Sequence, residues 1–247
     1  MNTIEIKTLT LNQKKFLHLV LAFVLAIFSP KIASFVADIY QVFFASIDPD
    51  KVFVWMYIHH LVQLFLALFV MALPFWNKSF KDWGFNLDHS GWSLRTVGHF
   101  CIGWIIFSAL FMLVIQVPPL VTYPLTTSNL IGDLFFDFIM TGISEEVLFR
   151  AMVMGILLLS WKSKIRIRKF EVSAAGLLAA IIFALAHIGF DLMPFQITYV
   201  NTMQLVFAFG LGIFYAVMFD KTGSLLGPIL AHGASDGLLT VIYLVIN

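Results

Sequence analysis

The sequence predicts an all-α fold, a polytopic transmembrane helix bundle of about seven spans, and three observations indicate this class. Hydrophobic residues make up 60% of the 247 residues and charged residues only 12%, whereas soluble domains contain about 45–50% and about 25% respectively. The mean hydropathy is correspondingly high, at +0.94. Apolar runs of about 20 residues, the length that a helix needs to cross a bilayer, recur along the whole chain.

Seven apolar stretches separated by short polar segments are the expected spans. The first follows Lys14-Lys15 and has no small-x-small cleavage site, so we expect it to be retained. It is interrupted by Ser29-Pro30-Lys31 and is too long for one straight crossing, which predicts a kink or an interfacial extension. The seven stretches cover approximately residues 16–47, 52–76, 96–117, 128–161, 172–190, 197–219 and 224–246.

The distribution of basic residues predicts the orientation of these spans. The cluster at 162–169 carries five positive charges in eight residues, and it falls on the same side as Lys14-Lys15, the 77–95 loop and Lys221. Lys51 is nearly the only basic residue in a loop on the other side. Basic residues accumulate in cytoplasmic loops, so we expect a multi-pass cell-membrane protein with a cytoplasmic N-terminus and an outer C-terminus.

Composition also excludes several classes of function. A net charge of +1 gives no reason to expect a nucleic-acid partner, and the lipid bilayer is the expected surroundings. Cys101 is the only cysteine, so neither an intrachain disulfide nor a cysteine-based metal site can form. The zinc-protease pattern His-Glu-x-x-His is absent.

The stretch Gly142–Arg150 places three full charges within six residues in the middle of an apolar run. A charged side chain at the centre of a bilayer costs about 2.5–3.5 kcal/mol, so such groups face a bundle interior or a wet cavity. Glu146 and Arg150 are four residues apart on a helix and are expected to pair, whereas Glu145 is rotated by about 100°. This pattern predicts an available carboxylate, Glu145, beside a structural ion pair. The alternative is one buried network that only holds helices together.

Two histidines in later spans extend this set. His187 lies one helical turn after Phe183, and His232 lies one turn before Asp236. A carboxylate four residues away can accept the ring N–H of a histidine and select its tautomer, so Asp236 is expected to support His232. Taken singly, His187 is more typical of a core histidine, and His232 with Asp236 of a helix contact.

The combination of an acid and two imidazoles from three spans predicts activation of water for attack on a carbonyl. One route uses a divalent metal such as Zn²⁺ held by Glu145, His187 and His232. The other route is metal-free, with Glu145 as general base and the imidazoles orienting water and stabilising the oxyanion. Weaker candidates are Asn201 and Gln204 for a substrate backbone, Asp133 and Asp137 for the entrance, and the interfacial pair His59-His60.

The motifs Glu145-Glu146-x-x-x-Arg150, Phe183-x-x-x-His187 and His232-x-x-x-Asp236 resemble those of the CPBP intramembrane proteases. This family, also called Abi, includes type II CAAX prenyl endopeptidases and bacteriocin-processing proteins. The resemblance covers roughly residues 130–240. It implies an all-helical intramembrane peptidase with N-terminal spans in 1–129 and the core spans in 130–247, which together form one membrane domain.

The resemblance also implies roles for individual residues. Glu145 would activate water, His187 and His232 would complete the site, and Glu146 with Arg150 would shape it. Asp236 falls where many members have Asn. The substrate would be a peptide or membrane protein, and the length and composition are typical of a bacterial protein. Metal use differs between accounts of the family, so a metalloprotease and a glutamate-type protease both stay open.

Two other functions fit the same residues. The first is a non-enzymatic bacteriocin-immunity or scaffold protein whose charges only pack helices. The second is a proton-coupled transporter, which also places carboxylates and histidines in its helices. Transporters often contain inverted repeats and broken helices, and no repeat of that kind is visible in this sequence.

Overall fold

The computed structural model describes residues 9–115, 119–167 and 170–246, and helices occupy most of each of the seven predicted stretches. The expectation of an all-α polytopic bundle is confirmed. Five helices in this described part are long and apolar enough to cross a membrane, namely Leu11–Phe44, Val54–Met71, Ser90–Val114, Thr202–Thr222 and Leu226–Ile246. The predicted end of the third span at Val117, together with Arg168 and Lys169 of the basic cluster, lies outside the described residues.

The helices and strands have the following bounds. The α-helices are α1 (Leu11–Tyr40), α2 (Val54–Met71), α3 (Ser90–Val114), α4 (Thr127–Phe135), α5 (Gly142–Glu146), α6 (Gly155–Leu157), α7 (Ala174–Leu185), α8 (Thr202–Thr222) and α9 (Leu226–Ile246). Two π-helical segments are η4 (Phe136–Thr141) and η5 (Val147–Met154), and three 3₁₀ turns are η1 (Gln41–Phe44), η2 (Pro74–Trp76) and η3 (Phe80–Trp83). The strands are β1 (Lys164–Ile167), β2 (Phe170–Ser173), β3 (Gly189–Leu192) and β4 (Phe195–Tyr199).

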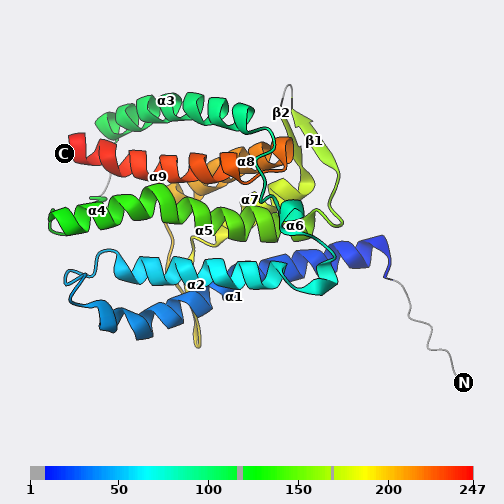
Figure 1. Ribbon diagram of the computed structural model, residues 1–247, viewed down its shortest axis with the longest axis horizontal. Coiled ribbons are helices and arrows are strands. Elements are labelled where there is room, and N and C mark those ends of the chain that lie inside the picture. The colour runs from blue at the N-terminus through cyan, green and yellow to red at the C-terminus, as the bar shows by residue number, and fades with distance from the viewer. Residues whose placement is uncertain (1–8, 116–118, 168–169, 247) are drawn as a thin grey trace, which may run out of the picture.

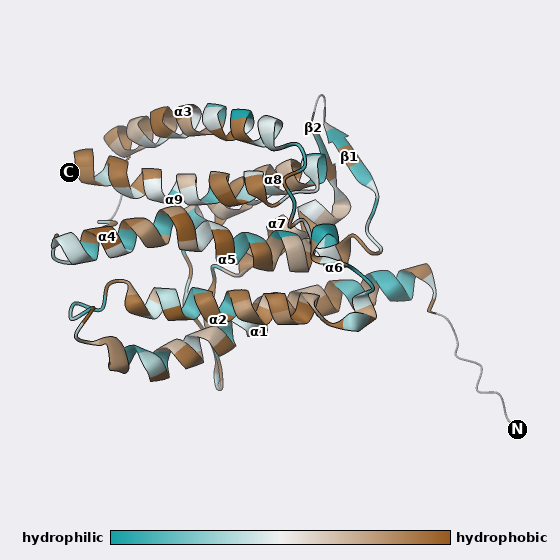
Figure 2. Ribbon diagram, in the orientation of Figure 1, coloured by the Kyte–Doolittle hydropathy of each residue, from teal (hydrophilic) through white to brown (hydrophobic). Residues whose placement is uncertain are grey.

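The long helices run roughly along one common axis. Figure 1 shows α3 above α9, then the rod formed by α4 to α6, then α2 and α1, with α7 and α8 behind. Neighbouring pairs pack along their lengths: α1 with α2, α3 with α9, and α7 with α8. The start of α1 and the end of α9 lie at opposite ends of the bundle (Figure 1). Most helical surface is hydrophobic, and hydrophilic residues are frequent at the end that carries β1 and β2 (Figure 2). This is a multi-pass membrane protein.

Local sequence explains where several helices begin. The Asp48 carboxylate accepts hydrogen bonds from the backbone N–H groups of Val52, Phe53 and Val54, and so satisfies the donors ahead of α2. Ser173 caps α7 by accepting from Gly176 N. Asn201 caps α8 in the same way, so it lies at the start of that helix and not inside a span as predicted.

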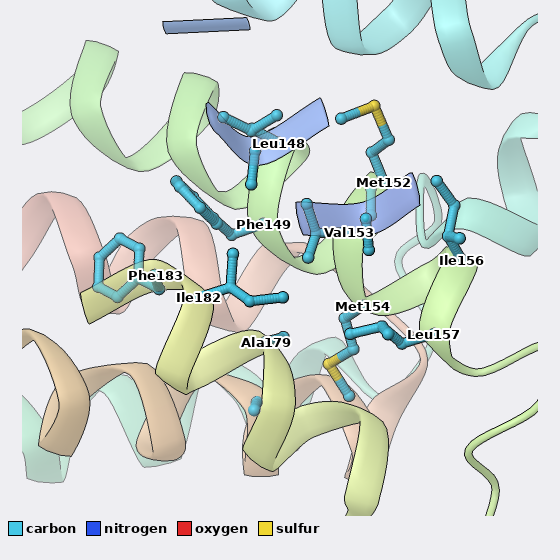
Figure 3. Close-up of a cluster of buried hydrophobic side chains, with 14 of the residues drawn as sticks. Leu148, Phe149, Met152, Val153, Met154, Ile156, Leu157, Ala179, Ile182 and Phe183 are labelled. Carbon is cyan, nitrogen blue, oxygen red and sulfur yellow. The ribbon is translucent and has the colours of Figure 1, made fainter. Parts of the chain in front are cut away.

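The fourth predicted span is a continuous helical rod that changes from α to π geometry twice. The π-helical segments η4 and η5 flank the single α-helical turn Gly142–Glu146. All eight residues of η5 are buried, and Figure 3 shows its apolar side chains packed against Ile182 and Phe183 of α7. A π-helical turn rotates the side chains that follow it and is often found at functional sites. The buried core of the molecule therefore surrounds the part of the rod that directly follows Glu145 and Glu146.

The fifth predicted span differs most from expectation. A helix was expected over residues 172–190, but α7 contains only 12 residues and is about 18 Å long, too short to cross a bilayer alone. It begins after one antiparallel hairpin, β1–β2, and ends before a second, β3–β4. Hydrophobicity identified an apolar segment here, but apolar composition is shared by buried strands and helices, so it did not indicate the hairpins.

The first hairpin contains part of the predicted basic cluster. Lys164 donates to the Glu171 carboxylate at 2.5 Å across the two strands, and both side chains are exposed. This hydrogen bond, with the lysine charge, lowers the pKa of Glu171 below its ordinary value. The cluster is therefore a solvated hairpin at one end of the bundle.

Glycines allow the rod to approach α9 closely, which gives a stability prediction. A Cβ on Gly233 would lie 2.1 Å from the carbonyl oxygen of Phe138 in η4, whereas a Cβ on Gly210 would meet no atom within 4 Å. Replacing Gly233 with alanine is expected to lower the free energy of unfolding by about 1–3 kcal/mol because two backbones must separate. Gly210→Ala, the matched control, is expected to be neutral or stabilising. Unfolding in mixed micelles measures both; equal effects would contradict this account of the packing.

Candidate active site

The turn Gly142–Glu146 directs its two glutamates to different surroundings. The Glu146 side chain is fully buried, and its Oε1 lies 3.1 Å from Nη1 of Arg150, as the four-residue spacing predicts. Arg150 is also fully buried; its Nη2 donates to Gly212 O at 3.1 Å, and its guanidinium lies over the Phe183 ring at 4.7 Å. Glu145 instead keeps 20% of its side chain exposed and lines a cavity. The buried pair thus leaves Glu145 as the available carboxylate.

His232 of α9 meets both glutamates. Its Nδ1 lies 2.7 Å from Glu146 Oε1, and because a carboxylate accepts, Nδ1 is the donor. Its Nε2 faces the cavity, 3.7 Å from Glu145 Oε2 and 3.4 Å from Asp236 Oδ2. The shorter hydrogen bond to the ring is accepted by Glu146, and Asp236 also contacts the ring, as its spacing predicts, at the longer distance. Asp236 contacts the opposite ring nitrogen because α9 presents that edge of the ring along its own axis.

His187 follows the end of α7 and lines the same cavity as Glu145 and His232. Its Nδ1 lies 2.8 Å from the carbonyl oxygen of Phe183. A carbonyl oxygen only accepts, so Nδ1 carries the hydrogen and Nε2 remains for a further partner. The Phe183 ring packs edge-on against both imidazoles, at 4.9 Å from His187 and 5.7 Å from His232.

The cavity has a volume of about 620 Å³, which is in the range of small-molecule and peptide-binding pockets. The polar groups converge in one part of a wall that is otherwise aromatic and aliphatic. Asn201 and Gln204, predicted as weak candidates, also line it. The other lining residues include Trp104, Phe107, Phe111, Met112, Phe207, Leu211, Tyr215 and Leu239.

His60 of α2 completes the surroundings of Glu145, although sequence reasoning assigned it to the interface. Its Nε2 lies 4.0 Å from Glu145 Oε1, so the Glu145 carboxylate is placed between imidazoles from α2 and α9. Its Nδ1 lies 2.5 Å from Ser144 Oγ, which itself donates to Met140 O at 2.8 Å. The sequence did contain a signal for His60, since a histidine within an apolar span needs a polar partner. It did not show which helix supplies that partner.

Tyr215 and Ser235 were also missed. The Tyr215 ring stacks on His232 with centroids 5.0 Å apart, and its hydroxyl lies 2.8 Å from Ser235 Oγ. Residues Gly233–Gly237 have the Gly-x-Ser-x-Gly spacing of serine hydrolases. They lie inside the continuous helix α9, whereas a serine nucleophile needs a strand-to-helix turn. Ser235 is buried and bonded to His232 O, so it is a structural group.

The remaining predicted entrance residues lie along the rod away from the histidines. Asp133 accepts from the Tyr123 hydroxyl at 2.5 Å, and Asp137 accepts from Thr240 Oγ1 at 2.6 Å. Both carboxylates are therefore held by hydroxyl donors. Nδ1 of His59 and Oγ of Ser34 form a hydrogen bond of 3.2 Å on the side of α2 that faces α1.

A bound metal ion needs several His, Cys, Asp or Glu side chains around one point. Within the described residues, no group of three or more His, Cys, Asp and Glu side chains is arranged to hold one. Glu145, His187 and His232 line one cavity, but as placed they do not form such a group.

Fold and site together define a class: a polytopic membrane protein with a carboxylate and imidazoles gathered around a cavity inside its helix bundle. Residues 127–238 match the model of the family described as type II CAAX prenyl endopeptidase Rce1-like, and this range contains every residue of the three motifs. This match, over a little under half of the chain, supports a CPBP/CAAX family of membrane proteases. No curated protein matches the chain, and no solved structure does.

Proposed function

We propose that this protein is an intramembrane endopeptidase in which Glu145 activates a water molecule for attack on a peptide bond. The observation that carries the proposal is the contrast between the two glutamates. Glu146 is fully buried and occupied by Arg150 and His232, whereas Glu145 opens onto the cavity with its two oxygens facing His60 and His232. The family match supports proteolysis, and a protease of this family acts on a peptide or protein in the membrane.

In the first step, Glu145 takes a proton from water while the water oxygen bonds to the scissile carbonyl carbon. The carbonyl π electrons move to its oxygen, which gives a tetrahedral intermediate with one negative charge. In the second step that charge returns to form the carbonyl, the C–N bond breaks, and Glu145 gives its proton to the departing nitrogen. The products are a carboxylic acid and an amine, and Glu145 is regenerated.

The two imidazoles differ in what they can do. His187 has its hydrogen on Nδ1, bonded to Phe183 O, so a neutral His187 offers Nε2 as an acceptor that orients the attacking water. His232 donates from Nδ1 to Glu146, and when it carries a second hydrogen, Nε2 can donate to the oxyanion. Because the surrounding wall is apolar, each such interaction is stronger than it would be in water.

A divalent metal such as Zn²⁺ is the alternative source of activation, with Glu145, His187 and His232 as its ligands. The ring hydrogen bonds of both histidines are of the kind that supports metal-bound imidazoles, since each leaves Nε2 for the ion. Such an ion would act as a Lewis acid on the carbonyl and lower the pKa of a bound water. Chelation distinguishes the two routes.

We place the protein in the bacterial cell membrane with the β1–β2 end in the cytoplasm. Two observations support this orientation. The basic residues of 162–167, a range that includes β1, and Lys221 near the end of α8 lie at one end of the bundle. Lys14 and Lys15, in the first turns of α1, lie at that same end (Figure 1). Accessibility of single cysteines in a Cys101→Ser background would test it.

The function is tested by comparing the membrane proteomes of cells that express the wild type or Glu145→Ala. A protease predicts at least one membrane peptide whose cut end is present with the wild type and lost with the variant. Protein levels and the elution profile in mild detergent establish that the variant is folded. Identical proteomes with a folded variant would remove the protease and favour an immunity or scaffold protein.

A further inference from the structure

The hairpin β3–β4 occupies an unusual place for exposed β-structure. Ser173, at the start of α7, donates its backbone N–H to Asp220 near the end of α8. The two helices are therefore antiparallel, and the start of α7 lies level with the end of α8. From there α7 extends about 18 Å and α8 about 31 Å, from 12 and 21 residues. The hairpin joins their other ends. Its root therefore lies within the length of the bundle and not beyond it.

Contacts with neighbouring helices also indicate that the root of the hairpin, at Gly189 and Phe190, lies within the length of the bundle. Gly189 and Phe190 line a second cavity of about 270 Å³. Lys31 of α1 and His59 of α2 also line it, and both are interior positions of their helices. At such depth, backbone groups exposed to lipid have no water to bond, and irregular or strand backbone is tolerated only where it has protein or cavity partners. A two-stranded hairpin is also only marginally stable by itself.

The two strands differ in how they are covered. The Lys31 ammonium bonds the carbonyl oxygen of Phe190 and lies over the Phe190 ring at 4.2 Å, so a side chain of α1 covers β3 at Phe190. All five residues of β4 are exposed. Within the described part of the chain, the backbone hydrogen bonds of β4 are those with β3. The outer edge of β4 is thus the open edge of the sheet.

This open edge leads directly into the active site. The hairpin starts two residues after His187, and Tyr199, the last residue of β4, lines the same cavity as Glu145. Tyr199 pairs with Gly189 across an irregularity in the register, whereas Ile197 and Phe195 pair with Phe190 and Leu192. Paired residues share a face, so Phe195 and Ile197 lie together on the face opposite to that of Tyr199. The face of Phe195 and Ile197 is apolar and exposed, with 72% and 56% of these two residues accessible.

We propose that β4 is the docking strand for the substrate, which adds to its outer edge as an extended segment and passes Tyr199 into the cavity beside Glu145. This inference rests on the proposed function. A peptide bond inside a helix is shielded by neighbouring turns and its carbonyl is already bonded, so the segment to be cut must be extended when water attacks it. Strand addition supplies the hydrogen bonds that such a segment loses, and it also satisfies the open edge of β4.

The proposal specifies a pattern of recognition. Substrate side chains on the face of Phe195 and Ile197 contact an apolar surface and are expected to be apolar themselves. Side chains on the opposite face meet Gln196, where polar residues are accepted. The substrate is therefore a segment in which apolar residues occur at every second position near the cut.

N-methylation of the substrate tests the proposal without altering the protein. The probe is a synthetic peptide that spans the cut mapped by the membrane comparison, prepared unmodified and as two isomers methylated at alternate backbone nitrogens away from the scissile bond. Alternate nitrogens of a strand point to opposite edges, so only one isomer loses the donors that face β4. We expect that isomer to have a KM about tenfold higher with kcat unchanged, and the other to match the parent peptide. Equal effects of the two isomers would overturn the proposal.

Hydrogen exchange provides a second readout. A version of the peptide with a reduced, uncleavable scissile bond is bound to the wild-type protein in detergent micelles. Hydrogen exchange of the β4 backbone amides is expected to slow. Exchange of the β3 amides is expected to stay the same, because β3 lies on the other side of β4 from the added strand. Binding without slower exchange in β4 would place the peptide elsewhere and overturn the proposal. Failure of the wild type to cut the unmodified peptide would instead count against the protease function.

Discussion

Replacing Glu145 with glutamine is expected to lower kcat for peptide cleavage by about 10²–10⁴-fold, because the amide cannot accept the proton of the attacking water. KM should change little, since the side chain keeps its size and most of its polar contacts. The measurement is the cleavage rate of the mapped peptide by purified protein in micelles, followed by mass spectrometry.

The matched control is Glu171→Gln, which removes the same charge from the exposed hairpin β1–β2. It should cleave at the wild-type rate. A second control adds a zinc chelator to the wild type: if side chains act alone, the rate is unchanged. Loss of activity restored by Zn²⁺, and not by Mg²⁺, would instead assign a metal to Glu145, His187 and His232. Full activity of a folded Glu145→Gln protein would contradict the general-base assignment.

Replacing Arg150 with methionine is expected to have the largest effect on stability, a loss of about 3–5 kcal/mol. The variant leaves Glu146, which is fully buried, without its cationic partner, and a buried uncompensated charge is costly. The effect should extend to the site because Glu146 also holds Nδ1 of His232 at 2.7 Å. Unfolding by titration with a denaturing detergent measures the change.

The double variant Glu146→Gln with Arg150→Met separates charge from packing. Removing both charges should recover part of the lost stability, since neither partner is then left buried and unpaired. Activity should stay low in the double variant, because glutamine holds His232 less firmly than a carboxylate does. Lys164→Met, at an exposed ion pair, controls for loss of a cation and should change stability by less than about 1 kcal/mol. A double variant no more stable than Arg150→Met would show that packing of the guanidinium, and not its charge, stabilises this region.

Much of the site was predictable because helical periodicity acts within one segment. The spacing of Glu146 and Arg150 placed them on one face and Glu145 on another, and the structure shows that pair in contact. The same reasoning accounts for only part of the surroundings of His232. The four-residue spacing of Asp236 from His232 brings it to the ring, but the shorter bond comes from Glu146 on a different helix.

The sequence alone determined the membrane class, the apolar segments and the few polar residues within them that require an explanation. These properties follow from composition and from periodicity along one chain, which do not depend on how helices are placed. Only the tertiary structure decided that His60 faces Glu145, that Glu146 orients His232, and that a hairpin takes the place of half a span beside His187. Contacts between helices depend on their rotation, offset and crossing. Those are set by packing over the whole bundle, including the close approach at Gly233, and no local pattern encodes them.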